Sequence, residues 1–309
     1  MAKLKNELSW SRTRMATLKT CHRLYYYQYY QKWGGWGWDA PEESRQAYFF
    51  SKMTNLPMLV GHAVHETIKR LLEDLRDFGE IRVEDPGLYL RKNFLSKTWQ
   101  DAEKQLWKKS VKKHPPVFEL YYDRAPSPDE MKQVGANAAD AIGTFLDSPF
   151  FAELQTDDKA DWLAVDPEPS FDESTKLKLN GRTIWALPDF ARRKDGKCEI
   201  WDWKTGRKNE HDELQLLSYA LYARDTWGFG PDDIRLFGYY LKNDEIAEYP
   251  CNADRMAFIE GEIESNFEML QGLLTDVGTN TPLEKEDAFP MIDDLSTCER
   301  CFYKQLCDR

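Results

Sequence analysis

The pattern that constrains this chain most is a run of short, alternating stretches that begins near Asp161. These stretches occupy residues 162–171, 175–180, 183–192 and 197–203. They are separated by Asn180-Gly181 and Asp195-Gly196, dipeptides that favour tight turns between paired strands. Beyond them, helical patterns cover 211–226 and 253–274, and strand patterns cover 234–241 and 246–250. This order predicts an α/β fold with a mixed sheet flanked by helices.

The chain before Asp161 is mostly helical in pattern. Apolar residues recur with helical spacing from Met58 to Phe78, which predicts an amphipathic helix. Further helical stretches lie at 9–32, 87–112 and 129–147, with prolines between the last two. Residues 33–38 combine three tryptophans with three glycines, which predicts a loop. The rings of this loop could stack on a ligand or cover the core.

We expect one domain, because no internal repeat or long low-complexity linker divides the 309 residues. Its parts are an N-terminal arm at 1–57, a helical region at 58–155, a core at 156–274 and a C-terminal segment at 275–309. The apolar runs are too short for a membrane span, and the polar N-terminus does not resemble a secretory leader. We therefore expect a cytoplasmic protein with no membrane partner, whose six cysteines are reduced thiols.

The net charge of −11 is unevenly distributed along the chain. Residues 1–60 hold nine basic and four acidic side chains, and residues 91–113 hold eight basic and two acidic ones. The second stretch also contains Phe94, Trp99 and Trp107. Cations interleaved with aromatic rings suit a strand of nucleic acid, because the cations neutralise phosphates and the rings stack on bases. The same stretch could instead be a solvated helix face whose tryptophans point into the core.

The most informative motif joins two aspartates and a lysine. Asp189 follows Pro188, twelve residues separate it from Asp202, and Lys204 lies in the same predicted strand as Asp202. Residues two apart in a strand share a face, so Asp202 and Lys204 project together. Two carboxylates from neighbouring strands can hold Mg²⁺, and a lysine beside them can orient a water that attacks a phosphodiester. On its own, the tripeptide is more typical of an exposed strand edge with an ion pair.

Other side chains fall where they could complete such a site. His65 lies on the predicted helix 58–78, where an inward imidazole could bind the metal. Gln215 and Tyr219 are four residues apart on the helix that follows the lysine, so they share a face. His62 lies one turn before His65, and it either joins the metal or faces solvent.

Four motifs, taken in order, resemble the RecB-type branch of the PD-(D/E)XK nucleases over residues 58–222. They are Gly61-x-x-x-His65-Glu66, Pro188-Asp189, Asp202-Trp203-Lys204-Thr205-Gly206 and Gln215-x-x-x-Tyr219. The resemblance implies a restriction-endonuclease-like core and DNA cleavage that depends on Mg²⁺ or Mn²⁺. The metal ligands that it implies are His65, Asp189, Asp202 and the main-chain carbonyl of Trp203. It also implies that Lys204 is the catalytic lysine, while Gln215 and Tyr219 contact DNA or brace the site.

Cysteines near the two ends of the chain suggest a second metal centre. Cys298, Cys301 and Cys307 lie among the last twelve residues, and Cys21 lies far upstream. This spacing suits either zinc or a [4Fe–4S] cluster, since both take four thiolates. The resemblance extends to the AddB and CRISPR-associated four-cysteine groups, which implies a [4Fe–4S] cluster in preference to zinc. If cysteines from both ends of the chain bind one metal centre, that centre would join the two ends and stabilise the fold.

These features lead us to expect an exonuclease that cuts single-stranded or unwound DNA ends in recombination or repair. The alternative is a non-catalytic DNA-binding or recombination-scaffold subunit with the same fold. A small-molecule metalloenzyme is a third class, and we find no sequence sign of a substrate pocket for it. The chain lacks the Gly-x₄-Gly-Lys-Ser/Thr phosphate loop, so a helicase would have to be a separate partner protein.

Overall fold

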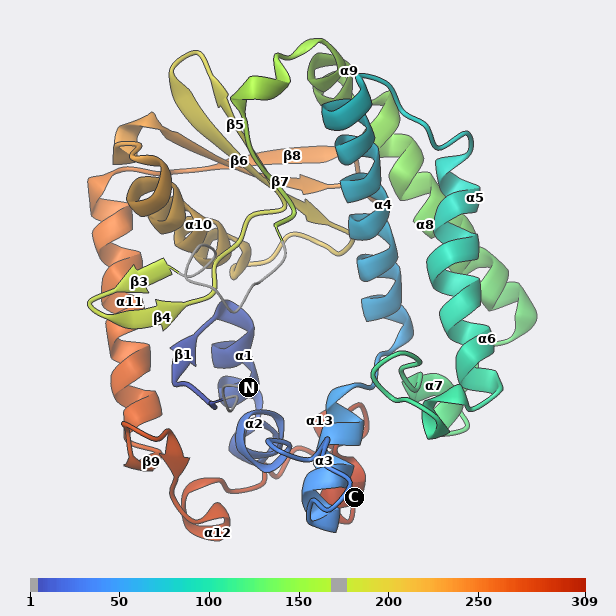
Figure 1. The fold of residues 1–309 in the computed structure, drawn as a ribbon, viewed down its shortest axis with the longest axis vertical. Helices are drawn as coiled ribbons and strands as arrows, with labels where there is room; N and C mark the ends of the chain where they lie inside the picture. The colour runs from blue at the N-terminus through green and yellow to red at the C-terminus, as the bar shows by residue number, and fades with distance from the viewer. Residues whose placement is uncertain (1–4, 168–176) are drawn as a thin grey trace.

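A five-stranded mixed sheet, called here the central sheet, organises the computed structural model, which describes residues 5–167 and 177–309. It lies in the upper part of the view in Figure 1. Its strands are β2 (Trp162–Val165), β5 (Phe190–Lys194), β6 (Lys197–Lys204), β7 (Ile234–Tyr240) and β8 (Glu245–Tyr249). They are adjacent in the order β2-β5-β6-β7-β8. β6 and β7 are parallel, and the other neighbouring pairs are antiparallel. The predicted α/β fold with a mixed sheet is therefore confirmed.

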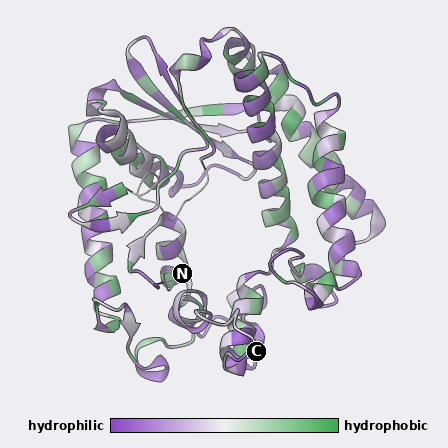
Figure 2. Ribbon diagram, in the orientation of Figure 1, coloured by the Kyte–Doolittle hydropathy of each residue, from purple (hydrophilic) through white to green (hydrophobic). Residues whose placement is uncertain are grey.

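Helices cover both faces of this sheet, because β6 is apolar on both. Cys198 and Ile200 share a hydrophobic cluster with α10 (Asp212–Trp227) and α11 (Ala253–Gln271). On the opposite face, Trp201 and Trp203 belong to a second hydrophobic cluster with α4 (Leu56–Phe78), α8 (Pro128–Asp147) and α9 (Pro149–Thr156). Strand alternation then places Asp202 on the face that α10 covers. Figure 2 shows hydrophobic segments along the strands and along α4, where they alternate with hydrophilic ones.

The helix predicted at 58–78 is confirmed as α4. The Asn55 side chain caps its start by accepting a hydrogen bond from the backbone N–H of Met58 at 2.9 Å. The helix ends at Gly79, whose φ of +75° is easily adopted only by glycine. Its buried positions, including Val64, Ile68 and Leu71, recur with helical spacing and face the sheet side of the molecule.

The predicted helix at 87–112 is shorter than expected. α5 (Pro86–Leu90), the π-helical turn η2 (Arg91–Ser96) and α6 (Lys97–Glu103) follow one another without a break. Gln105 then adopts a φ of +51°, which ends the helical path before Lys112. Short helical segments connect the rest of this region, and they are η3 (Leu106–Lys108), α7 (Phe118–Tyr121) and η4 (Lys159–Asp161).

The expectation of a single strand at 183–192 is wrong. β4 (Arg182–Ile184) belongs to a separate three-stranded sheet with β1 (Ser9–Trp10) and β3 (Leu177–Leu179), and β5 belongs to the central sheet. Pro188 lies between them and has no N–H for a strand ladder, so the chain crosses there from one sheet to the other. The predicted hairpin at Asn180-Gly181 joins β3 to β4. Parts of the predicted stretches 162–171 and 175–180 lie at 168–176, outside the described residues.

The helix expected at 9–32 is divided into shorter elements. After β1 come α1 (Arg12–Thr20), α2 (His22–Tyr26) and the π-helical turn η1 (Tyr27–Gln31). The breaks occur at Ser11 and Cys21, which are extended and whose side chains cap α1 and α2. After the loop at 33–38, which is confirmed, the chain forms α3 (Glu42–Ser51).

Elements from near the two ends of the chain, α2 and α3 on one side and α13 (Leu295–Cys298) and η7 (Lys304–Cys307) on the other, lie together on the side away from the central sheet (Figure 1). The other C-terminal elements are β9 (Leu274–Asp276), β10 (Thr281–Pro282) and α12 (Lys285–Ala288), whereas the short η6 (Pro231–Asp233) precedes β7. Tyr27, Phe50, Phe118 and Tyr303 form a hydrophobic cluster that unites these ends with the helical region. Among the described residues, no helix has both the length and the apolar character that a membrane crossing needs.

Candidate active site

The β5–β6 hairpin brings the two predicted aspartates together. Asp195 and Gly196 form its turn, with φ angles of +49° and +77° that match a tight hairpin turn. In this register Phe190 pairs with Trp201, so Asp189 lies opposite Asp202 at the open end of the hairpin. Asp202 contacts Tyr219 of α10, whereas Asp189 contacts His65 of α4, so the two carboxylates lie between these helices at the end of the hairpin.

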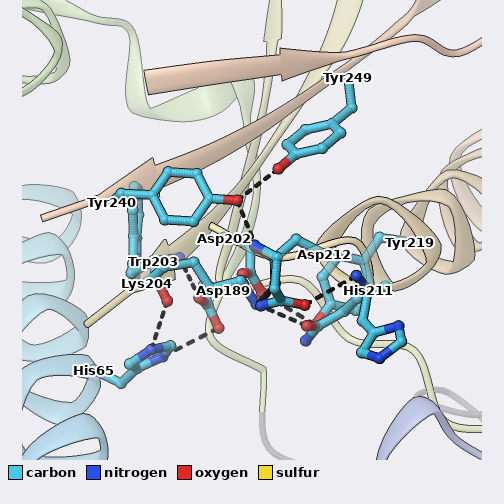
Figure 3. Close-up of polar contacts among 12 residues, drawn as sticks. His65, Asp189, Asp202, Trp203, Lys204, His211, Asp212, Tyr219, Tyr240 and Tyr249 are labelled. Carbon is cyan, nitrogen blue, oxygen red and sulfur yellow. Dashed lines mark hydrogen bonds and ion pairs between the residues drawn. The ribbon is translucent and has the colours of Figure 1, made fainter. Parts of the chain in front are cut away.

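His65 reaches the same point from α4 (Figure 3). Its Nδ1 lies 3.3 Å from Oδ1 of Asp189, and its Nε2 lies 2.9 Å from the main-chain oxygen of Trp203. The N–H of Trp203 donates to Oδ2 of Asp189 at 2.7 Å. The imidazole of His65 is thus within hydrogen-bond or ion-pair distance of both a carboxylate and a main-chain carbonyl.

Lys204 lies in a closed ring of polar contacts with three other predicted residues. Its Nζ is 2.5 Å from Oδ2 of Asp202 and donates to Oε1 of Gln215 at 2.7 Å. Nε2 of Gln215 donates to the hydroxyl of Tyr219 at 2.6 Å. This hydroxyl donates to Oδ1 of Asp202 at 3.3 Å, which closes the ring. The structure therefore brings together His65, Asp189, Asp202, Lys204, Gln215 and Tyr219, as well as the Trp203 carbonyl.

Buried acids dominate the electrostatics of the site. Burial raises the pKa of Asp202 and the charge of Asp189 raises it further, to about 6, despite the neighbouring Lys204. Burial lowers the pKa of His65, but nearby carboxylates, Asp189 first, outweigh burial and raise it to about 9. Burial also lowers the pKa of Lys204, but Asp202 and other acids outweigh it, so the net shift is upward. Each shift indicates a site with an excess of negative charge, which a cation would relieve.

Two further acids belong to this neighbourhood, and the sequence analysis missed both. Asp212 lies 3.8 Å from Nζ of Lys204, and its carboxylate accepts hydrogen bonds from the Tyr240 hydroxyl at 2.6 Å and the Asn209 N–H at 3.0 Å. The sequence could have revealed Asp212, because it lies three residues before Gln215 and therefore on the same face of the helix. The N–H of Asp166 donates to the main-chain oxygen of Asp189 at 2.6 Å. No sequence signal marks Asp166, because its place depends on the pairing of β2 with β5.

The donor set suits a hard divalent cation. One imidazole nitrogen, two carboxylates and a main-chain oxygen are ligand types that Mg²⁺ and Mn²⁺ accept. At present these groups contact one another through hydrogen bonds and ion pairs. In the ranges that the structure describes, no three or more His, Cys, Asp or Glu side chains are spaced as a metal site, either here or at the cysteines.

The four cysteines of the predicted cluster surround one cavity. Cys21, Cys298, Cys301 and Cys307 all line a space of about 230 Å³ between α2 and the C-terminal segment. All four are free thiols. Burial raises the pKa of Cys301 to about 12, and the three other thiols also contribute. The set of donors fits a four-thiolate centre, although the thiols are not arranged as a formed cluster.

Other predicted features lie apart from the catalytic residues. His62 is exposed and pairs with Glu66 at 3.8 Å, so its solvent-facing interpretation is supported. In residues 91–113 the lysines are exposed, whereas Trp99 and Trp107 are half-buried. Trp107 packs against Phe49 and Tyr121. This stretch therefore presents cations to solvent, but its tryptophans are not free rings.

Comparisons with known proteins identify one family. A family model described as the PD-(D/E)XK nuclease superfamily matches residues 9–308. No curated protein matches the chain. A solved structure titled "Crystal structure of SSO0001" is 14% identical and covers 91% of this chain and 94% of its own. Its TM-score is 0.27, an overlap too low to equate the two folds.

Proposed function

The chain belongs to the PD-(D/E)XK nuclease superfamily, and on this premise we propose that it is a deoxyribonuclease that degrades single-stranded or unwound DNA from its ends. Membership implies a phosphodiester hydrolase that uses Mg²⁺ or Mn²⁺ and binds DNA. The observation that carries the finer proposal is the convergence of His65, Asp189, Asp202 and Lys204 at the open end of one hairpin. An inactive scaffold would not need all four groups at one place.

The proposed metal ligands are His65, Asp189, Asp202 and the carbonyl of Trp203. When bound there, a divalent cation neutralises charge on the scissile phosphate and activates water as a nucleophile. The contact between the Trp203 N–H and Asp189 holds this carboxylate toward the imidazole at 2.7 Å. The burial of Asp202 excludes water from its oxygens, so the carboxylate interacts strongly with cations nearby.

We assign Lys204 an electrostatic role. Its pKa is raised above the ordinary value by Asp202 and neighbouring acids, despite burial, which favours the charged ammonium form of its amine. An ammonium group can orient a water for in-line attack and stabilise the charge that develops on the phosphate oxygens. Gln215 and Tyr219 hold the lysine and Asp202 in a single arrangement.

The preference for single-stranded DNA is supported by surface chemistry. The lysines of residues 91–113 are exposed on the helical region and can contact phosphates without reading a base. Trp36 and Trp38 are also exposed, and exposed aromatic rings can stack on the bases of a single strand. The chain has no phosphate loop, so unwinding would fall to a helicase or recombination partner.

We also propose that Cys21, Cys298, Cys301 and Cys307 hold a [4Fe–4S] cluster, as in the AddB-type nucleases that the sequence resembles. The support is their position around one cavity. Four thiolates would also accept zinc, and metal analysis of anaerobically purified protein separates the two. Free thiols and such a cluster are consistent with a reducing cytoplasm.

The test is cleavage of DNA labelled at either end, single-stranded or duplex, with Mn²⁺ or Mg²⁺. We expect single strands to be shortened progressively from an end. Lys204→Ala and Asp202→Asn should each reduce the rate at least ~100-fold, because each removes a charge that acts on the reacting phosphate. Lys208→Ala, an exposed lysine close in sequence, is the matched control and should cut normally.

Unchanged cleavage by Lys204→Ala would place the activity at another site or in a contaminant. DNA binding without any cleavage by the wild-type protein would favour the scaffold function instead. Cleavage of circular single strands would show an endonuclease.

A further inference from the structure

A second carboxylate, that of Asp212, lies beside Lys204 and is not among the proposed metal ligands. Asp212 is the first residue of α10 and is 4% exposed. Its Oδ1 lies 3.8 Å from Nζ of Lys204, which among the described residues is the one cation in ion-pair contact with it. Burial lowers the pKa of Arg12, and the charge of Asp212 opposes this effect without an ion pair. The lysine is therefore the nearest cation for this acid.

Hydrogen bonds from two residues hold the carboxylate of Asp212 in place. Its Oδ2 accepts from the hydroxyl of Tyr240 at 2.6 Å and from the N–H of Asn209 at 3.0 Å. Its Oδ1 accepts from the side-chain amide of Asn209 at 2.8 Å. The contact with Lys204 is therefore made by a group whose orientation is already fixed. This carboxylate would have to break several buried hydrogen bonds in order to turn away.

The Tyr240 hydroxyl is itself held by a second tyrosine (Figure 3). It lies 2.6 Å from the hydroxyl of Tyr249. Because the single hydroxyl hydrogen of Tyr240 is donated to Asp212, Tyr249 is the donor in this second bond. Tyr240 is fully buried, and Tyr249 is half-buried on the edge strand β8. A chain of hydrogen bonds thus connects the acid beside Lys204 to the edge of the central sheet.

The register of the central sheet places the lysine and the tyrosine together. In the parallel pair of β6 and β7, Asp202 pairs with Gly238 and Lys204 pairs with Tyr240, so Lys204 and Tyr240 project to the same face. A Cβ added to Gly238 would lie 3.3 Å from the hydroxyl oxygen of Tyr240. The missing side chain at Gly238 therefore leaves room for the tyrosine to lie back along its own strand.

Asp202 has two tasks in the proposed function, which makes a second acid useful. It is a proposed metal ligand, and its Oδ2 also pairs with Nζ of Lys204 at 2.5 Å. A divalent cation attracts a carboxylate more strongly than an ammonium group does, because it carries twice the charge. Cation binding at Asp202 would therefore weaken its hold on Lys204. A largely buried ammonium group that loses its counter-ion is strongly unfavourable.

We propose that Asp212 is a positioning residue that serves as the second counter-ion of Lys204. Fixed by Tyr240 and Asn209, it keeps the ammonium group in place when a cation draws on Asp202. In this role it acts through the lysine rather than on the substrate. The inference rests on the proposed function in taking Asp202 as a metal ligand.

The first test measures Mn²⁺ binding by calorimetry in the absence of DNA. In Asp212→Asn, cation binding at Asp202 leaves Lys204 without a charged partner, so we expect about 10-fold weaker binding than in wild type. Tyr240→Phe keeps every charge and removes only the hydroxyl that orients Asp212. We expect it to bind Mn²⁺ several-fold more weakly. If Asp212→Asn fails to fold, Tyr240→Phe decides the question alone.

Tyr239→Phe is the matched control, because it also removes a buried tyrosine hydroxyl from β7. This hydroxyl donates to Asp244 at 2.7 Å. Tyr239 is the neighbour of Tyr240 in the strand and therefore projects from the opposite face. The control should bind Mn²⁺ as wild type does. Equal binding by wild type, Asp212→Asn and Tyr240→Phe would overturn the proposal.

The second test asks whether Asp212 acts through Lys204. Lys204→Ala leaves no ammonium group for Asp212 to hold. Adding Asp212→Asn to this variant should therefore weaken Mn²⁺ binding by less than ~2-fold, because residues that act as a unit are not additive. A loss of the same size with and without the lysine would show that the carboxylate acts directly on the cation or through Arg12, and would also overturn the role.

The two proposals can fail separately. If Asp212→Asn weakens Mn²⁺ binding through Lys204 but wild type never cuts DNA, the nuclease proposal is wrong and the positioning role stands. If wild type cuts DNA while the Asp212 and Tyr240 variants bind Mn²⁺ and cut normally, the positioning role is wrong and the nuclease proposal stands. A wild-type protein that binds no Mn²⁺ would overturn both.

Discussion

The polar groups around Lys204 form a closed ring of contacts. Lys204 contacts Asp202 and Gln215, Gln215 contacts Tyr219, and Tyr219 returns to Asp202. Because Asp202 and Tyr219 are buried, these hydrogen bonds form in a low-dielectric environment that strengthens them and penalises any alternative arrangement. The ring therefore fixes the direction of the ammonium group before DNA arrives.

Gln215 is the member of this ring that can be removed without removing a charge. Gln215→Ala should leave Lys204 free to pair with Asp202 in several orientations, so we expect cleavage to fall about 10- to 100-fold, as for groups that orient metal ligands. The fold should survive, with a melting temperature within a few degrees of wild type. Gln133→Ala, on an exposed face of α8, is the control. Equal cleavage by the two variants would show that the lysine needs no support from Gln215.

The β5–β6 hairpin is the element on which the site depends. It carries Asp202 and Lys204, and its register places Asp189 opposite Asp202. Because side chains alternate between faces, a slip of one residue would turn one aspartate away from the other. The tight turn at Asp195-Gly196 leaves no room for such a slip.

Gly196 is where this register can be tested. Its φ is +77°, with nothing within 4 Å of an added Cβ, so Gly196→Ala should destabilise the protein through backbone strain alone, by about 1–2 kcal/mol. Gly143→Ala is the matched control, since Gly143 lies in α8 with open space around it and no positive φ. Alanine should be neutral or stabilising there by up to ~1 kcal/mol. Urea unfolding curves compare the two, and equal midpoints would contradict the argument.

Local patterns in the sequence were sufficient to predict the central elements. The hairpin dipeptides, the period of α4 and the spacing from Asp189 to Lys204 each depend on neighbours in the chain, and each matches the structure. The crossing at Pro188 from one sheet to another depends on tertiary pairing. The same is true of Asp166, which lies near the site because β2 pairs with β5. Periodicity carries no information about either.

At the scale of the whole molecule, the two ends of the chain hold each other. Nε of Arg23 donates to the main-chain oxygen of Phe289 at 2.7 Å, and its guanidinium pairs with Glu286 at 2.7 Å. The hydroxyl of Tyr27 donates to the main-chain oxygen of Leu306 at 2.8 Å, and its ring stacks on Tyr303. These contacts close nearly the full length of the chain around the cavity that the four cysteines line.

The four cysteines come together only in the folded chain. Binding of a cluster to them would therefore stabilise the folded state. Protein purified without oxygen should then contain about four irons per chain and absorb visible light. Cys21→Ala and Cys301→Ala should each lose the iron and lower the melting temperature by about 5–10 °C. Cys251 is a half-buried thiol that does not line the cavity. Cys251→Ala is therefore the control, and it should keep its iron and its melting temperature. Zinc in place of iron would identify the other four-thiolate centre, and variants that keep both their metal and their melting temperature would show that the ends close without one.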